Sequence, residues 1–434
     1  MAGFRSPLDA YREDLSRAGD RKRFATGDEF WILLATGLRR VVQEPHVRRP
    51  AAARRLANIL LTFGKELAKC PAPTIEIGEA GPAVVVERAA AVADALARFP
   101  EADDAGLLVR HVCAAAADAE EAGAVGLARE IVTDLRVLSS HAQPLDRGLV
   151  LMQLARIART LGELDATLDL LRAVGDLGRA TGTRELEVRE AVGEGVLAHT
   201  RGNHPEARRL FETALAGASE LGLVDVMGLA HQGLLIICAS AGEFDLALHH
   251  GWNALSAART EGTREAEALG NLAELCAKAG YHDAALGGFA LALTRTAAPR
   301  IRLPALAGIA TAAGRLGDAP RLRLADEAIA REANDAFSYE TAGAWLALAR
   351  AKRALGDPAG SDAAAKKAAV IAHAHGFFEI AHYLHQDTQP APAPLAEPAL
   401  QVIRSLTAWS GDNAADLVLS YMSTDDSSHT RHRD

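Results

Sequence analysis

The chain has 434 residues, with 47 Lys and Arg against 56 Asp and Glu, which gives a formal net charge of −9. Hydrophobic residues make up 49% of the chain but aromatic residues only 5%, so Ala, Leu and Val must fill most of the core, as suits closely packed helices. No apolar run is long enough to span a bilayer, and the first residues carry no apolar signal segment. We therefore expect a soluble, cytoplasmic protein that does not contact membranes.

The N-terminal region, residues 1–80, is predicted to be a basic helical cap. Residues 1–70 hold 14 Lys and Arg against 8 Asp and Glu. Apolar stripes predict two helices between Asp28 and Lys69 and a further helix from Pro82 to Phe99. Clustered arginines are typical of nucleic-acid contacts, which here would involve Arg39, Arg40, Arg48, Arg49, Arg54 and Arg55. Because no helix-turn-helix, zinc finger or aromatic stacking module accompanies them, we favour a solvated helical face or docking against the acidic remainder.

Glycines then punctuate the chain at a nearly constant period. The turn glycines are Gly123, Gly162, Gly202, Gly242, Gly280, Gly317 and Gly356, which lie 39, 40, 40, 38, 37 and 39 residues apart. A second series of helix breaks is predicted at Gly182, Gly222, Gly262, Asn334 and Gly376. Glycine, and sometimes asparagine, adopts the left-handed conformation that ends a helix. Two breaks per period therefore indicate a repeat of two helices.

The residues around these turns resemble the tetratricopeptide repeat (TPR), which combines small and aromatic residues on two helices. Three stretches carry the resemblance: Gly195, Gly202, Ala207, Phe211 and Ala214; Gly280, Ala285, Phe289 and Ala292; and Trp345, Leu348 and Ala349. The period exceeds the usual length of about 34 residues, as in the extended variant of bacterial peptide-sensing regulators and motor-protein light chains. The resemblance implies an all-α, right-handed superhelical solenoid of helical hairpins over residues 81–387, with helical caps.

A Pro-rich linker is expected at 388–398, and one or two amphipathic helices at 399–422. These helices form either a distal cap or an arm that docks in the protein's own groove. The tail, 423–434, is expected to be disordered.

In this family the first helix of each hairpin lines a concave wall that meets an extended peptide. The resemblance therefore implies partner-binding residues at a fixed phase from each turn glycine: Arg110, Met152, Gln153, Arg156, Arg159, Arg189, Val192, His199, Gln232, Ile236, Asn271, Glu274, Arg350 and Arg353. Thr311 and Leu346 share this phase. Arginines suit carboxylates, so we expect a protein or peptide partner with acidic groups. The alternative is that these arginines are solvated or ion-paired within the repeats.

Two further features of the wall bear on the partner. Apolar contact is expected from Met152, Val192, Ile236 and Leu346, and Gln232 and Ile236 replace the Lys and Asn with which related domains clamp chaperone tails. Glycines recur on the first helices at Gly193, Gly233, Gly270 and Gly308, although a glycine inside a helix costs about 1 kcal/mol relative to alanine. Close helix packing is the favoured explanation, and close approach of a partner's backbone is the alternative.

Chemistry has little support in the sequence. His375, Glu379 and His382 could face one another and hold a divalent metal, but a helix break at Gly376 would separate them. The four cysteines have no metal or redox spacing, and neither a phosphate-binding loop nor a nucleophile elbow is present. We therefore expect a non-catalytic scaffold without a cofactor that binds a protein or peptide. The alternatives are a peptide-sensing regulator whose basic region contacts nucleic acid, and a metal-dependent α-helical enzyme.

Overall fold

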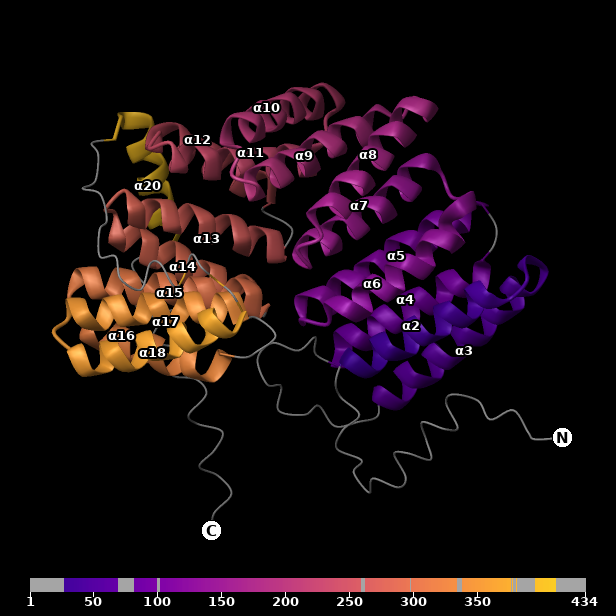
Figure 1. The fold of residues 1–434 in the computed structure, drawn as a ribbon, viewed down its shortest axis with the longest axis horizontal. Helices are drawn as coiled ribbons and strands as arrows, with labels where there is room; N and C mark the ends of the chain where they lie inside the picture. Colours follow the sequence, from indigo (N-terminus) through magenta and orange to yellow (C-terminus); the bar gives the residue numbers. More distant parts are fainter. Residues whose placement is uncertain are drawn as a thin grey trace, which may run out of the picture. The chain divides into compact units, whose positions relative to one another are not determined.

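The computed structural model describes residues 27–68, 82–99, 102–258, 262–296, 298–333, 338–375, 377, 380 and 395–410. These residues form 18 α-helices and no β-strand, so the predicted all-α class is confirmed (Figure 1). The chain divides into two compact units, residues 1–193 and 194–434. The sequence did not predict this boundary, which falls inside a continuous helix.

Unit 1 is built from the helices that precede the boundary. In chain order they are α2 (Gly27–Gln43), α3 (Arg49–Leu67), α4 (Pro82–Arg98), α5 (Ala102–Glu121), α6 (Val125–Leu138), α7 (Pro144–Thr160), α8 (Leu164–Thr181) and the first part of α9 (Arg184–Thr200), with short 3-10 turns at His46–Arg48 and Ser139–His141. The two N-terminal helices and the helix beginning at Pro82 are therefore confirmed.

The N-terminal helices share one core with the repeats that follow. Helix α2 packs on α6 as well as on α3, and α3 packs on α4. Leu34, Leu38 and Leu60 from the first two helices belong to the same buried cluster as Leu96 and Ile131. Residues 27–67 are thus an integral layer of unit 1.

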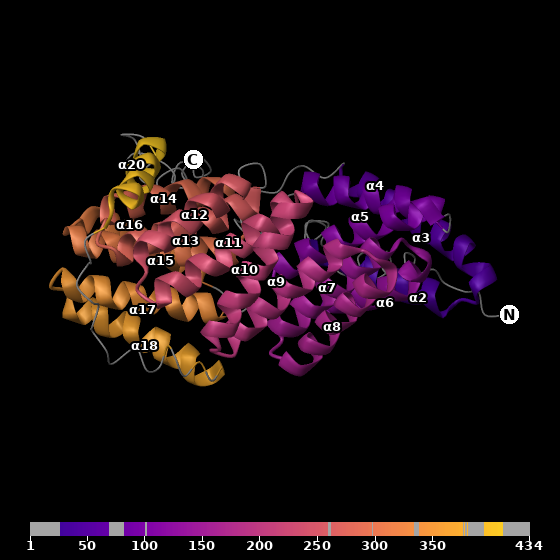
Figure 2. The same ribbon diagram turned by 90° about the horizontal axis from the view of Figure 1, so that it is seen from above.

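Unit 2 continues the alternation of helices (Figure 2). Its further helices are α10 (His204–Leu221), α11 (Val224–Ser240), α12 (Phe244–Ala258), α13 (Gly262–Lys278), α14 (His282–Arg295), α15 (Pro299–Leu316), α16 (Ala319–Glu332), α17 (Ser338–Ala354), α18 (Pro358–His375) and α20 (Glu397–Ser410). Odd-numbered helices from α5 to α17 are the first helices of the predicted hairpins, and each is followed by an even-numbered second helix.

The turn glycines behave as predicted. All seven have a positive φ, between 75° and 88°, and so do Gly182 and Gly222. Gly202 is one example. Because it is left-handed, its N–H donates to the His199 carbonyl at 2.8 Å and the Asn203 N–H donates to the Ala198 carbonyl at 2.9 Å, both in the last turn of α9. The Asn203 side chain then accepts the N–H of Glu206 at 3.4 Å and caps α10. One short turn therefore ends one helix and begins the next.

The second series of breaks is confirmed in part. Gly262 is the first residue of α13, and α12 ends at Ala258, so Gly262 begins a helix where the pattern predicted the end of one. Asn334 and Gly376 lie outside the described residues. Most of the predicted linker lies outside them too, and Glu397 and Pro398, which were assigned to it, belong to α20.

Helix α20 packs on α12 and α14, which are second helices. Ile403 and Leu406 of α20 are buried in the core of unit 2, and the Ala396 N–H donates to Asp245 of α12 at 2.8 Å. The sequence left two arrangements open for this segment, a distal cap or an arm in the groove of the first helices. Helix α20 contacts second helices, so it is not such an arm. The predicted helix over 413–422 lies outside the described residues.

Candidate functional site

A groove of about 510 Å³ runs across three consecutive first helices of unit 2, α13, α15 and α17. This volume is typical of ligand sites in proteins. Its lining includes Glu267, Gly270, Asn271, Glu274 and Lys278 from α13, Arg300, Pro304, Gly308 and Thr311 from α15, and Tyr339, Glu340, Gly343 and Ala347 from α17. His282 and Phe289 of α14 complete it. The groove is therefore built from the helices that the repeat pattern assigned to the binding wall.

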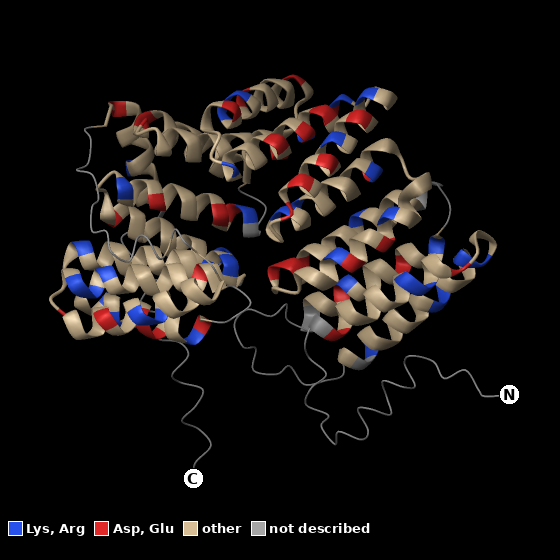
Figure 3. Cartoon of the chain, viewed as in Figure 1, with Lys and Arg blue, Asp and Glu red and all other residues tan. Residues whose placement is uncertain are grey.

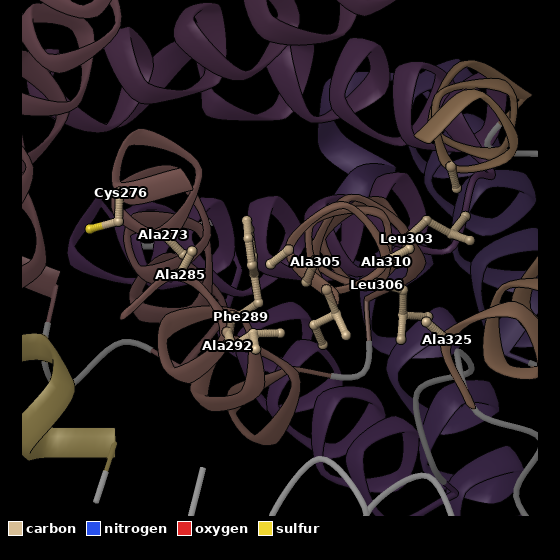
Figure 4. Close-up of a cluster of buried hydrophobic side chains, with 14 of the residues drawn as sticks. Ala273, Cys276, Ala285, Phe289, Ala292, Leu303, Ala305, Leu306, Ala310 and Ala325 are labelled. Atoms are coloured by element: carbon tan, nitrogen blue, oxygen red, sulfur yellow. The ribbon is translucent and has the colours of Figure 1, made fainter. Parts of the chain in front are cut away.

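Glycines on the three helices differ in what covers them. A Cβ atom at Gly308 would overlap the ring of Phe289, which projects from α14 toward Ala305 on α15 (Figure 4). At Gly270 and Gly343 a Cβ atom would meet no atom within 4 Å. Gly308 is thus explained by packing inside the protein, whereas Gly270 and Gly343 face open space in the groove.

Polar groups in the groove also fall into two classes. Arg300 forms an ion pair with Glu267 at 3.5 Å, and Lys278 pairs with Glu274 at 2.8 Å. Within the part of the chain that the structure describes, neither Glu340 nor Asn271 forms an ion pair or a side-chain hydrogen bond. The two cations of the lining are therefore already neutralised, while one carboxylate and one carboxamide face the groove without a partner among the described residues.

His282 adds a third polar group at the groove. Its Nδ1 atom is buried and has no hydrogen-bond partner in the part of the chain that the structure describes. Burial, and secondarily the charge of Arg315, lowers the pKa of this imidazole below its ordinary value. His282 is therefore neutral at pH 7 and adds no positive charge to the groove.

The packing of the aromatic residues identifies the repeat. Ala207, Phe211 and Ala214, which the pattern placed on one face, are all buried. The Phe211 ring lies against Gly195 of α9, where a Cβ atom would come within 2.8 Å, and against Gly233 of α11, where it would overlap the ring. A second helix whose aromatic ring lies against small residues of the first helices on either side matches the tetratricopeptide pattern. The chain has a TPR-like helical-repeat fold.

No protein-family model and no curated protein matches the sequence. Solved structures similar to the chain include BtubC (BKLC) from P. vanneervenii, at 12% identity over 72% of this chain and 96% of that chain, with a TM-score of 0.34. A Rap protein complexed with competence and sporulation factor has 11% identity over 82% of this chain and 99% of that chain, with a TM-score of 0.49. A STAND signal-transduction ATPase with a tetratricopeptide repeat sensor, from Pyrococcus horikoshii, has 14% identity over 79% of this chain and 55% of that chain, with a TM-score of 0.44. Because these three scores are below 0.5, the TPR-like assignment depends on this chain's own hairpins.

The predicted wall residues of unit 2 have several environments. Asn271 and Glu274 line the groove, as does Thr311. Gln232 lines a much smaller cleft beside α12 and α13, and Ile236 packs partly buried against the core. Leu346 is only 9% exposed, so it has little surface to offer a partner. Arg350 is half-buried and has a partner, and Arg353 pairs with Asp362 of α18 at 3.4 Å.

In unit 1 the arginines of the predicted wall are engaged within the fold. Arg156 forms an ion pair with Glu120 of the preceding first helix at 3.0 Å, and Gln153 donates to the same carboxylate at 3.3 Å. Arg110 and Arg189 pair with Asp146 and Glu185, and Arg159 also has a partner. Figure 3 shows basic and acidic residues interspersed along these helices. The structure thus has the ion-paired arrangement that the sequence left as the alternative.

The other predicted wall residues offer little free polar surface. Met152 is half-buried, and Val192 is only 6% exposed, so the apolar contact expected from Val192 is directed into the core. His199 lies against the ring of His204, and burial lowers its pKa. Its Nδ1 atom is buried, without a hydrogen-bond partner among the residues described.

Three of the six basic N-terminal arginines are held by the fold. Arg39 pairs with Glu130 of α6 at 3.2 Å, Arg55 pairs with Glu44, and Arg49 donates to the backbone carbonyls of Val42 and Glu44. Arg40, Arg48 and Arg54 are exposed and have no ion pair among the described residues. The contiguous cationic surface that the sequence suggested is thus reduced to these three side chains.

Metal binding, membrane spanning and cysteine chemistry find no support in the described residues. They contain no group of three or more His, Cys, Asp or Glu that could hold a metal ion, and no helix among them is long and apolar enough to cross a membrane. Glu379 and His382 of the predicted metal group lie outside the described residues. Burial raises the pKa of the Cys113 and Cys276 thiols to about 12, so neither is a nucleophile at neutral pH.

A pair of histidines in unit 2 makes stability depend on pH. The Nδ1 atoms of His231 (α11) and His250 (α12) are 2.9 Å apart, so one imidazole must donate while the other accepts. Burial, together with His231 and His249, lowers the pKa of His250 to about 4 from its ordinary 6.5. Between these values the unfolded chain binds more protons at this site than the folded chain, so stability falls as the pH decreases through this window.

We expect the midpoint of thermal unfolding to drop between pH 7 and pH 5, and to drop less in His250→Gln than in the wild type. His373→Gln, at an exposed position on α18, is the control and should keep the wild-type dependence. If His250→Gln and the wild type lose the same stability over this range, the histidine pair does not contribute.

Proposed function

We propose that this protein binds an extended peptide segment of a partner protein in the groove formed by α13, α15 and α17, without covalent chemistry. The observation that supports the proposal is the open space over Gly270 and Gly343. Glycine inside a helix costs about 1 kcal/mol relative to alanine, and nothing in the described fold requires it at these two positions. Close approach of a ligand backbone would require it.

The aromatic rings of the second helices explain why these glycines differ. Phe211 covers Gly233, and Phe289 covers Gly308, and each of these two glycines lies nine residues before its turn glycine. Gly270 lies ten residues before Gly280, one position away from that phase, and the preceding α12 has Gly251 where the TPR pattern would place an aromatic residue. The surface over Gly270 is open.

The dimensions and polar groups of the groove suit a short extended chain. Neighbouring helix axes lie about 8–10 Å apart, so three helices extend over roughly 16–20 Å. At about 3.3 Å per residue, that length accommodates roughly five or six residues of extended peptide. The Asn271 carboxamide has both a donor and an acceptor and can therefore pair with a peptide group of the ligand. A preformed groove also lowers the ordering penalty of binding.

A steric block provides the test. Gly270→Leu/Gly343→Leu places two large side chains in the groove. It also replaces glycine with a better helix former, which should preserve or raise the midpoint of thermal unfolding. The probe is a set of fluorescein-labelled hexapeptide pools, each randomised except for one fixed residue, and the readout is fluorescence polarisation. We expect saturable binding to the wild type, and binding at least about tenfold weaker to the double variant, since the added side chains occupy the space of the ligand.

Gly126→Leu is the matched control, because Gly126 also has open space over its Cβ position but lies in α6 of unit 1. It should bind the peptide pools like the wild type. If no pool binds the wild type, or if the double variant binds as well as the wild type, the groove is not a peptide site.

A further inference from the structure

The charges that line the groove are unevenly satisfied. It contains three carboxylates, Glu267, Glu274 and Glu340, and two cations, Lys278 and Arg300. Each cation pairs with a carboxylate of α13. The charge left over is therefore the Glu340 carboxylate, on the first turn of α17.

Glu340 lies beside an aromatic residue that is unusually open. Tyr339 is 48% exposed, lines the same groove and contacts Phe377 edge to face, with ring centroids 5.2 Å apart. A tyrosine that is nearly half exposed in a groove has surface that a ligand can contact in addition to Phe377. Tyrosine rings attract cations over their faces, so both residues at this end of the groove favour positive charge.

We propose that Glu340 and Tyr339 select a peptide with a lysine or arginine side chain that reaches the first turn of α17. This inference depends on the proposed peptide-binding function and specifies the class of peptide. A cationic side chain would compensate the leftover carboxylate, whereas an acidic side chain would face it with like charge. The acidic partner expected from the sequence relied on arginines that the fold engages elsewhere.

The test compares hexapeptide pools that differ only in their fixed residue, Arg, Lys, Gln or Glu, all acetylated and amidated so that the termini carry no charge. We expect the Arg and Lys pools to bind the wild type about tenfold more tightly than the Gln pool, since a charge-assisted hydrogen bond in a partly enclosed site has roughly this effect. Glu340→Gln should remove the preference, and Glu340→Lys should make the Glu pool the strongest binder. The preference should also weaken as the salt concentration rises.

Controls separate failure of this inference from failure of the proposed function. Glu327→Gln removes an exposed carboxylate on α16, away from the groove, and should bind all pools like the wild type. Because Glu340 has no protein partner within the described residues, its variants should keep the wild-type circular dichroism. If the wild type binds the pools with equal affinity or prefers Glu, the basic-peptide inference is wrong while the groove remains a peptide site. If no pool binds, both fail.

Discussion

Replacing Glu332 with alanine is expected to lower the free energy of local unfolding around α15 and α16 by about 3–5 kcal/mol, because it leaves a buried arginine without its carboxylate. The side chains of Arg302 and Glu332 are only 2% and 8% exposed. Arg302 donates from Nε to Glu332 at 3.0 Å and from Nη1 to the Leu293 carbonyl at 3.3 Å. One guanidinium therefore joins the ends of α14 and α16 to α15, and hydrogen–deuterium exchange of these three helices measures its effect.

Two further variants define what the buried pair contributes. Arg302→Met/Glu332→Leu removes both charges and keeps most of the volume, so it should recover most of the protection that the single variant loses. Arg209→Ala breaks an ion pair with Glu206 whose side chains are 61% and 41% exposed. It should leave the hydrogen–deuterium exchange of these helices close to that of the wild type, because solvent screens an exposed pair. Unchanged exchange in Glu332→Ala would mean that the buried pair is no more important than a surface pair.

The hairpins could be predicted from the sequence because their signals are local. A glycine at Gly202 or Gly242 ends one helix whatever its tertiary surroundings, since the left-handed conformation of the turn depends on that residue. The aromatic at Phe211 and the alanines around it follow the helical period, so their burial could also be predicted. The placement of α20 could not, because an amphipathic stripe specifies a buried face but not the helix that covers it.

Two of the wall arginines were harder to interpret because their partners lie about one repeat away. Arg156 meets Glu120 and Arg110 meets Asp146, and Arg208 of the second helix α10 meets Glu243 at a similar separation. The phase from a turn glycine places a side chain on a helix face but does not show whether the next hairpin supplies an opposite charge. A search for opposite charges separated by one repeat would have identified these pairs from the sequence.

The sequence alone also does not show which glycines of the wall are covered by a neighbouring side chain. Gly270 and Gly308 belong to one series in the sequence, yet only Gly308 is covered by a ring. They are one residue out of phase, ten and nine residues before their turn glycines, and the preceding second helix has Phe289 before Gly308 but Gly251 before Gly270. The sequence pattern fits either helix packing or a partner's backbone at all of these glycines alike, whereas the structure distinguishes the positions one by one. Gly343 was missed because it was not considered part of that series.

Leu406→Asp is expected to expose the apolar face of α14 and convert the protein to aggregated or oligomeric species. Residues 284–293 of α14 are all buried, and a helix that is apolar on every side needs neighbours around its whole circumference. Helix α20 provides one of them, since Leu406 is fully buried and its Cδ2 atom would be 3.3 Å from a Cβ at Gly288. Removing a buried leucine costs about 2–5 kcal/mol, and burying an unpaired carboxylate adds to that penalty. Light scattering after size exclusion and the binding of a hydrophobic dye measure the result.

Gln401→Asp, at an exposed position on the same helix, should retain the wild-type size and dye binding. If Leu406→Asp does the same, α20 is not needed to cover α14. A soluble but dye-binding product would instead show that the hairpins of unit 2 fold without α20 and that its role is to cover α14.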